Sequence, residues 1–320
     1  MIFFARLALL FSVGLCSCGA EKIASFSGKT MGTTWNVQIA QPVSSRDRDA
    51  IRLKIGEELD RLENIFSTWK SDSEISRFNL IQTTEVIPVS SSLASVVSVA
   101  LRISSETHGA FDPTLGPLID LWGFGKAGRM ESPPSPEEIQ AVRQRCGAHH
   151  LQVSLDPPTL QKSIPNLEVN PSALVEGYAA DQLGQWLRSQ GYDDWLIEIG
   201  GEILASGNSL AGQPWKAGIQ TPEAPEGELI SSFPLQNAAL ATSGTYRQRF
   251  DHGGRSYSHV IDPRTGYPVE TPLVSVSVVG SSCLLADAYA TALLVLGRDQ
   301  GEPLAKRLHL RVFWIQDSDR

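Results

Sequence analysis

The order of helix-like and strand-like segments is the feature that most constrains the fold of this 320-residue chain. Apolar residues recur at helical spacing in several segments, and runs of strand-like segments separate them without a regular β-α-β alternation. Regular alternation would favour a parallel sheet covered by helices on both faces, whereas runs of strands favour antiparallel pairing. The sequence therefore predicts an α+β fold with mixed, largely antiparallel sheets and flanking helices.

The helices have recognisable ends. In 135–147, Ser135 is placed to cap the helix, Pro136 occupies the first turn, Glu138 completes a capping box and Gly147 follows the end. Ser90 or Ser91 can begin another helix that stops at Gly109. The full set of predicted helices is 44–66, 90–109, 135–147, 172–188 and 283–296, the last stopped by a glycine at 297.

Strands are predicted where β-branched and aromatic residues alternate between turn signals. The stretch DWLIEIGGEILASG reads as two strands joined by a hairpin or bulge at Gly200-Gly201. The other predicted strands are 150–155 and the regions near 215–220, 246–250 and 273–279. No internal repeat, low-complexity tract or linker divides the chain.

Composition limits the possible ligands. The chain is 42% hydrophobic and 19% charged, so it can bury a sizeable core. Its net charge of -8 and the lack of a run of Lys or Arg argue against a nucleic-acid partner. A bound phosphate group would need local donors or a metal ion.

The N-terminus has the pattern of a bacterial secretory signal, with Arg6 before a short apolar run and small residues around two cysteines. LCSC resembles a lipobox in which Cys18 becomes the acylated first residue; a plain cleaved signal is the alternative. We therefore expect a signal peptide at 1–18, a short tether at 19–27 and one folded domain at 28–320. Cys146 and Cys283 could pair in an oxidising compartment, but we expect two buried free thiols.

Asp287 and Thr291 lie one turn apart on an otherwise apolar helix. They could be two oxygen ligands for Mg²⁺, which takes a few protein oxygens and completes its shell with water and phosphate. The alternative is an Asp stabilised by the positive end of the helix, with Thr291 bonding back to the chain. The helix alone does not decide between them.

Three glycine-containing segments are candidate parts of a binding site. EIGGEI could bring backbone N–H groups to a ligand or mark a bulge. ATSGTYR could form a donor-rich turn. THGAFDPTLGPLIDLWGFG carries four residues suited to a planar heterocycle or to a packed aromatic loop, namely Phe111, Asp112, Trp122 and Phe124.

His259 in SHVIDPRTGYP fits no metal-ligand spacing, since it has no second His at i+4. It is either a strand histidine satisfied by a neighbour or a general base near neutral pH.

Eight segments in order resemble the motifs of the ApbE-type FAD:protein FMN transferase family, from about Gly28 to Gly297. They are KTMGTTW, FSTWKSDSEISRFN, GAFDPTLGPLIDLWGFG, EGYAAD, IEIGGEI, ATSGTYR, SHVIDPRTGYP and ADAYATALLVLG. The resemblance implies an ApbE-like, T-fold-related architecture. It also implies Mg²⁺-dependent transfer of FMN from FAD to a Thr or Ser hydroxyl of a target protein, with release of AMP.

The resemblance carries roles to individual positions. Asp287 and Thr291 match the metal ligands, with an oxygen from Ala173 available only through its backbone carbonyl. The expected FAD contacts are Met31, Trp69, Ala110, Phe111, Asp112, Asn170, Glu176 and Ile261.

This chain departs from the family pattern at three of its positions. Asn170 replaces an Asp, and Glu176 stands where many members carry Lys, so the metal must neutralise more of the phosphate charge. Ala290 stands where some relatives have another carboxylate, which leaves Asp287 as the carboxylate that we assign to the ion.

The chemistry that the family implies gives His259 a task. The acceptor hydroxyl must lose its proton during attack on phosphorus, and His259 is our candidate base, with Asp262 orienting it. Water as the acceptor would instead make the protein an FAD pyrophosphatase, and the absence of turnover would make it a flavin-binding lipoprotein.

The family also suggests partners and a location. Its known acceptors include flavin-carrying subunits of Na⁺-pumping quinone reductase or Rnf-type complexes. Its members usually lie on the periplasmic face of the inner membrane, where we expect this chain to be lipid-anchored.

Overall fold

A computed structural model describes residues 23–126, 128, 132–210, 212–220 and 229–316. Its centre is a seven-stranded sheet in which every neighbouring pair is antiparallel, in the order β1-β2-β6-β7-β10-β13-β14. The strands are β1 (Ala24–Thr30), β2 (Thr33–Ile39), β6 (Trp195–Ile199), β7 (Glu202–Ser206), β10 (Ala238–Gly244), β13 (Leu273–Gly280) and β14 (Arg311–Gln316). This confirms the predicted α+β class with largely antiparallel sheets.

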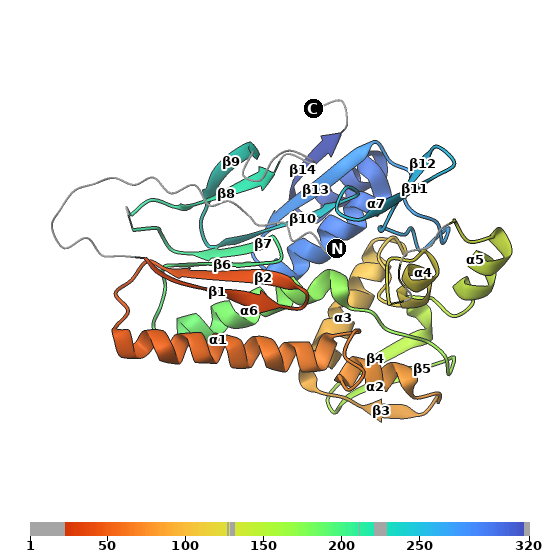
Figure 1. Cartoon of the computed structure of the whole chain (residues 1–320), viewed down its shortest axis with the longest axis horizontal. Helices are drawn as coiled ribbons and strands as arrows, with labels where there is room; N and C mark the ends of the chain where they lie inside the picture. Colours follow the sequence, from red (N-terminus) through yellow and green to blue (C-terminus); the bar gives the residue numbers. More distant parts are fainter. Residues whose placement is uncertain (1–22, 127, 129–131, 211, 221–228, 317–320) are drawn as a thin grey trace.

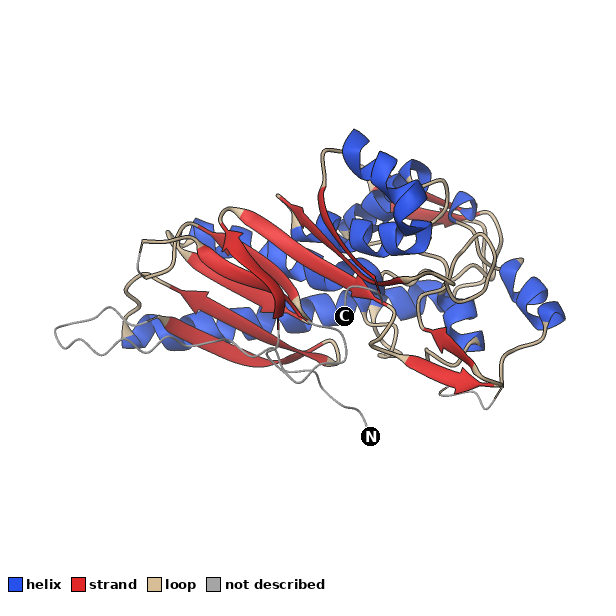
Figure 2. Ribbon diagram, turned by 90° about the horizontal axis from the view of Figure 1, so that it is seen from above, coloured by secondary structure: helices blue, strands red, loops and turns tan. Residues whose placement is uncertain are grey.

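Both faces of the sheet are covered, and alternate residues of a strand serve different faces. Three helices, α1 (Ser45–Phe66), α6 (Ser172–Ser189) and α7 (Cys283–Arg307), pack against one face (Figure 1). The hairpin of β8 (Trp215–Gln220) and β9 (Leu229–Leu235) covers the other face. Ile197 therefore joins the helix-side core, while the neighbouring Leu196 packs under the hairpin. Figure 2 shows the strands of the large sheet lying over the helices when the molecule is seen from above.

Smaller units flank one end of the sheet (Figure 1). A three-stranded sheet contains β3 (Val86–Pro88), β5 (Pro158–Lys162) and β4 (Leu151–Leu155). The helices of this end are α2 (Glu74–Leu80), α3 (Ser91–Glu106), α4 (Gly116–Leu121) and α5 (Pro136–Arg143), with a 3₁₀ turn at Ala148–His150. A hairpin of β11 (Arg249–His252) and β12 (Arg255–Ser258) completes it.

The predicted helix starts are confirmed where a local cap determines them, whereas α5 ends at Arg143, earlier than the predicted helix 135–147. Ser44 and Ser90 accept hydrogen bonds from the first turns of α1 and α3, and Ser135 forms the full capping box with Glu138. At Gly297 (φ 71°) the helical geometry of α7 breaks as expected, but a further helical segment continues to Arg307.

The strand predictions were right for β4, β6, β7, β8 and β13 and incomplete elsewhere. β6 and β7 form the predicted hairpin at Gly200-Gly201. The strand predicted near 246–250 lies instead at 249–252, and ATSGTYR, expected as a turn, contains the end of β10, where Ser243 pairs with Val276 of β13. A polar, glycine-containing segment can be a strand when its partners lie far along the chain.

The start of the folded part differs from the expected one, and both cysteines of the folded part are free. Residues 24–27 of the expected tether belong to β1, with Ala24 and Phe26 buried, so the folded part begins earlier than 28. Cys146 and Cys283 are both free, Cys283 buried and Cys146 half-buried. The signal segment and Cys18 lie outside the described residues. Across those residues, no helix combines the length and apolarity needed to cross a bilayer.

Candidate active site

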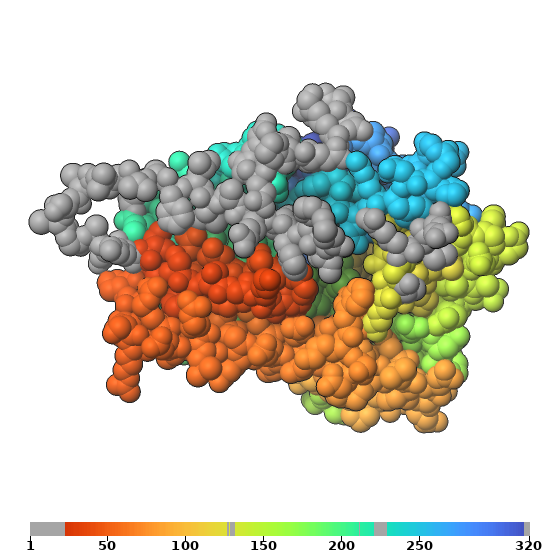
Figure 3. All heavy atoms as spheres, viewed as in Figure 1, coloured from red at the N-terminus to blue at the C-terminus, as the bar shows by residue number. Residues whose placement is uncertain are grey.

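A cavity of about 400 Å³ opens between the large sheet and the smaller units. Figure 3 shows the surface hollowed between the β1–β2 turn (red) and the segment after α3 (yellow), with α6 (green) at the floor. Most elements that carry the predicted motifs contribute to its wall. The residues that line it include Thr33, Ala110, Phe111, Asp112, Leu115, Asn170, Ala173, Glu176, Gly200, Glu202, Ser243, Arg247, Gln248, His259, Ile261, Asp287 and Thr291.

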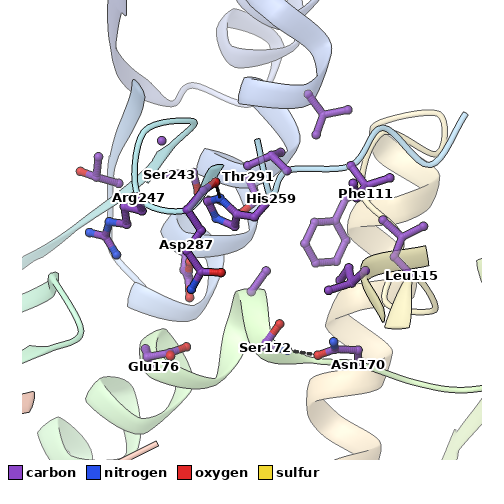
Figure 4. Close-up of a pocket in the computed structure, with 18 of the residues that line it drawn as sticks. Phe111, Leu115, Asn170, Ser172, Glu176, Ser243, Arg247, His259, Asp287 and Thr291 are labelled. Atoms are coloured by element: carbon purple, nitrogen blue, oxygen red, sulfur yellow. Dashed lines mark hydrogen bonds between the residues drawn. The ribbon is translucent and has the colours of Figure 1, made fainter. Parts of the chain in front are cut away.

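One side of the cavity is apolar. Phe111 and Leu115 lie across the hollow from the charged and hydroxyl-bearing side chains (Figure 4). Ala110 and Ile261 are buried in the same wall. Trp122 and Phe124, which also looked suited to a heterocycle, do not line the cavity but pack behind it, in a cluster that includes Leu115 and Ile261. There Trp122 donates to the Gly266 carbonyl at 2.9 Å. The apolar side therefore has room for a flat ring system. Of the four residues that the sequence suggested for this role, Phe111 and Asp112 line the cavity.

The opposite side presents Asp287 and Thr291 from α7 (Figure 4). The Thr291 hydroxyl is 2.9 Å from the hydroxyl of Ser243, at the end of β10. This contact holds both hydroxyls in the wall and reduces their freedom to rotate. The predicted Asp287–Thr291 pair is thus on the cavity surface, with a third oxygen from Ser243 of strand β10.

Asp287 is in an environment that disfavours its negative charge. Burial raises its pKa well above the usual range, and the nearby carboxylates of Glu202 and Glu176 raise it further. Burial likewise raises the pKa of Glu176 to about 7, again with Glu202 contributing. Three acidic groups sharing one cavity wall need a cation or protons to compensate them.

The donor set fits a divalent ion that prefers oxygen. Ala173 has a non-helical backbone (φ -81°, ψ 21°) at the start of α6, which rotates the peptide carrying its carbonyl away from the regular helical direction. Within the described part of the chain, no three His, Cys, Asp or Glu side chains form a metal-binding group by themselves. A metal here would therefore combine Asp287 with hydroxyl and carbonyl oxygens and with oxygens of the substrate, as Mg²⁺ does.

Arg247 supplies positive charge to this wall. Its guanidinium donates to the Gly200 carbonyl at 3.2 Å, and a Cβ at Gly201 would lie 2.8 Å from Nη2. Gly200 (φ 66°) and Gly201 (φ 107°) also have backbone angles that favour glycine. The two-glycine turn therefore binds the Arg247 guanidinium as well as connecting the two strands of the hairpin.

His259 is held by the backbone of Gln248. Its Nδ1 lies 3.2 Å from the Gln248 carbonyl oxygen, which favours the tautomer with hydrogen on Nδ1 and leaves a lone pair on Nε2. Burial lowers its pKa to about 4, with the charge of Arg247 contributing and the carbonyl opposing. The imidazole is therefore neutral at pH 7 and able to accept a proton.

Asp262 does not take the predicted place beside His259. Its two carboxylate oxygens accept hydrogen bonds from Arg264 at 2.8 to 3.2 Å and close the turn that follows. Because a carboxylate adjacent in sequence can point to either side of a turn, the motif did not reveal this. The Gln248 carbonyl occupies the orienting position instead.

Two predicted FAD contacts line the cavity but also organise the backbone. Asp112 accepts from Thr114 and from the Ala148 N–H at 2.9 Å. Asn170 accepts from the Ser172 N–H at 3.1 Å, at the start of α6 (Figure 4).

Met31 and Trp69 do not lie in the cavity wall. Met31 (φ 50°) is in the β1–β2 turn, two residues before Thr33, which does line the cavity. Trp69 is 69% exposed, an uncommon position for tryptophan.

Sequence reasoning missed Arg247, Glu202 and Gln248. Arg247 ends the ATSGTYR motif, and Glu202 lies in EIGGEI. Glu202 could have been found from its motif, because an acidic residue lies on each side of Gly-Gly within two otherwise apolar strands. Gln248 acts through its main chain, so its side-chain identity gave no indication.

The comparisons with known proteins agree with this geometry. The model of the ApbE family matches residues 31–314. The chain belongs to the ApbE family. Among curated ApbE-related proteins, the FAD:protein FMN transferase of Vibrio cholerae is 38% identical over 313 residues, covering 98% of this chain and 93% of the relative. The FAD:protein FMN transferase of Escherichia coli K12 is 37% identical over 326 residues, covering 98% and 93%.

Solved ApbE structures share the fold. The flavin transferase ApbE of Vibrio cholerae superposes with a TM-score of 0.84 at 38% identity, covering 92% of this chain and 94% of that one. The apo flavinyl transferase ApbE of Pseudomonas stutzeri gives a TM-score of 0.82 at 35% identity, covering 92% and 91%. The predicted ApbE-like architecture is confirmed.

Proposed function

We propose that this protein is an FAD:protein FMN transferase that uses magnesium. The observation that supports this proposal most strongly is the cavity, in which an apolar wall faces Asp287, Thr291 and His259. A flavin or adenine ring fits the apolar side, and a diphosphate would then meet the polar side. The ApbE membership and the names of the relatives agree with this reaction.

Asp287, Thr291 and the Ala173 carbonyl would hold Mg²⁺. When bound, the ion supplies charge neutralisation to phosphate oxygens, which makes phosphorus more open to attack. Arg247 adds a fixed positive charge from the β10 side, in a chain where Glu176 replaces a family Lys. Ala110, Phe111 and Ile261 would contact the ring system, with Asp112, Asn170 and Glu176 as further FAD contacts in the cavity. Met31 and Trp69 remain predicted FAD contacts, although neither lines the cavity wall.

The chemical step is a substitution at the phosphorus of the FMN half of FAD. The oxygen of the acceptor Thr or Ser forms a bond to this phosphorus, and the bond between phosphorus and the bridging oxygen breaks, so AMP leaves with that oxygen. The hydroxyl proton passes to Nε2 of His259, which carries a free lone pair because the imidazole is neutral at pH 7. The product is FMN joined to the acceptor by a phosphoester.

The acceptor and the location are proposals from the sequence. We propose flavin-carrying subunits of Na⁺-pumping quinone reductase or Rnf-type complexes as acceptors. We further propose that cleavage before Cys18 and acylation of this cysteine anchor the protein on the periplasmic face of the inner membrane.

Intact-mass measurement tests the function. Purified protein is incubated with FAD, Mg²⁺ and an acceptor subunit, and in parallel with an acceptor whose target Thr is replaced by Val. Transfer predicts an FMN-sized mass increase on the first acceptor only, with one AMP released per adduct. Free FMN and AMP without an adduct would instead identify a pyrophosphatase, and intact FAD would identify a binding protein.

A further inference from the structure

The first turn of α7 is held by a side chain from α6. The carboxylate of Asp181 accepts from the Ser282 hydroxyl at 2.7 Å, the Cys283 N–H at 2.9 Å and the Leu284 N–H at 3.1 Å. The first N–H groups of a helix lack partners within the helix, so they must be satisfied from outside. Here an acidic residue about a hundred positions earlier in the chain satisfies two of them, while Ser282 itself caps Leu285.

The two helices are also unusually close at this point. Gly177 lies one turn before Asp181 on α6, and a Cβ on it would be 2.5 Å from the Cys283 carbonyl oxygen. Glycine therefore permits the approach, and Asp181 fixes the position of the end of α7. Neither Gly177 nor Asp181 lines the cavity wall.

The contact lies one helical turn from the nearest residue assigned to the metal on each helix. Ala173 stands on α6 four residues before Gly177, and Asp287 and Thr291 stand on α7 four and eight residues after Cys283. Helices are stiff over such short distances, so the axial position of the first turn of α7 determines where Asp287 and Thr291 lie relative to α6.

We propose that Asp181 is a positioning residue that sets the register of α7 on α6 and thereby the affinity of the cavity for Mg²⁺. The proposal rests on the proposed function, because it assigns the metal to Asp287, Thr291 and the Ala173 carbonyl. A carboxylate suits the task because its two oxygens serve three donors, and its charge is favourable at the positive end of a helix. An amide at this position would offer one acceptor oxygen in place of two.

The test compares Mg²⁺ binding in Asp181→Ala, Asp181→Asn and Ser282→Ala with the full-length wild type. Ser282→Ala removes one of the three contacts and keeps the carboxylate, so it remains informative if Asp181→Ala does not fold. Gln185→Ala is the matched control, because Gln185 is exposed on α6 one turn after Asp181. Mg²⁺ affinity is measured by calorimetry without FAD, and the half-saturating Mg²⁺ concentration and the KM for FAD are measured in the transfer assay.

We expect Asp181→Ala to weaken Mg²⁺ binding by about 10- to 100-fold, as loss of a residue that supports metal ligands typically does. Asp181→Asn and Ser282→Ala should shift it less in the same direction, and Gln185→Ala should match the wild type. The KM for FAD at saturating Mg²⁺ should change much less, because the apolar wall comes from other elements.

Unchanged Mg²⁺ affinity in folded Asp181→Asn and Ser282→Ala would overturn the proposal, as would equal losses in Mg²⁺ and FAD binding, which indicate general loosening. Failure of the wild type itself to bind Mg²⁺ would count against the proposed metal site and hence the function. The two failures are therefore distinguishable.

Discussion

Gly177 of α6 and Cys283 of α7 are in direct backbone contact, with no room for a side chain between them. The nearest atoms to a Cβ on Gly177 would be the carbonyl oxygen and carbon of Cys283 and the N of Leu284, all main-chain atoms at 2.5 to 2.8 Å. Main-chain atoms of a packed helix cannot move aside as a flexible side chain can.

We therefore predict that Gly177→Ala lowers the free energy of unfolding by about 1–3 kcal/mol, the usual cost of overpacking a core. Gly56→Ala in α1 is the control, because nothing lies within 4 Å of its Cβ position. That substitution should be neutral or stabilising by roughly 0.5–1 kcal/mol, since alanine favours a helix. Urea denaturation of both variants measures the difference; equal stability would mean that the helices lie further apart.

We predict that Asp287 lowers the stability of the metal-free protein while being required for transfer. Because burial and two neighbouring carboxylates raise its pKa, Asp287→Asn should stabilise the metal-free protein by on the order of 1 kcal/mol while reducing transfer at least about 100-fold. Added Mg²⁺ should raise the Tm of the wild type and leave that of the variant unchanged.

Asp299→Asn, at an exposed position of the same helix, is the control for charge alone. Thermal unfolding with and without Mg²⁺ is the measurement. A Tm of Asp287→Asn that still rises with Mg²⁺ would place the ion elsewhere.

Arg247 is predicted to act on phosphate rather than on the ring system. Arg247→Met should weaken FAD binding by roughly 10- to 100-fold, because a charged hydrogen bond contributes about 1.5–3 kcal/mol. Riboflavin, which has the same ring and no phosphate, should bind both proteins alike. Fluorescence titration with the two ligands tests this, with exposed Arg255→Met as the control.

A parallel loss of riboflavin affinity would mean that Arg247 shapes the cavity through the Gly200 turn instead. Arg247→Lys keeps the charge but lacks the planar fork that fits phosphate oxygens. We expect it to recover part of the FAD affinity.

His259 is predicted to affect both activity and the pH dependence of stability. His259→Gln should reduce transfer by about 10²- to 10⁴-fold at pH 7.5 with saturating FAD and Mg²⁺, the range typical for loss of a general base. Transfer near the wild-type rate would remove His259 from the mechanism.

The same residue should destabilise the wild type in acid. Its folded pKa is about 4, below the unfolded value of 6.5, so between these values the unfolded chain binds a proton that the folded protein does not. Stability contributed by the neutral imidazole is thus present above pH 6.5 and lost as the pH falls towards 4. The variant should lose less stability across that interval in denaturation experiments at a series of pH values.

Much of the candidate site could be predicted from the sequence, because its motifs are local. The spacing of Asp287 and Thr291 puts them on one helical face wherever the helix packs, and Gly200-Gly201 predicts a tight connection wherever the strands pair. Ser44, Ser90 and Ser135 begin their helices through hydrogen bonds to residues three positions away.

The remaining features depend on partners far along the chain. The orienting group for His259 was expected at Asp262, three residues away, but Arg264 binds that carboxylate and the Gln248 carbonyl faces the imidazole. Ser243 and Gly244 were predicted to lie in a turn, but they form the end of β10, where they pair with Val276 and Ser275 of β13.

Composition and short-range spacing were enough to predict the fold class, the helix starts and the residue types needed for phosphoryl transfer, and the order of the motifs carried the ApbE resemblance. That Arg247 shares a cavity wall with Asp287, and that Asp181 holds the first turn of α7, depends on the packing of the folded chain. The residues of these two pairs are 40 and about 100 positions apart, and no local pattern encodes how the helices and the sheet that carry them pack together.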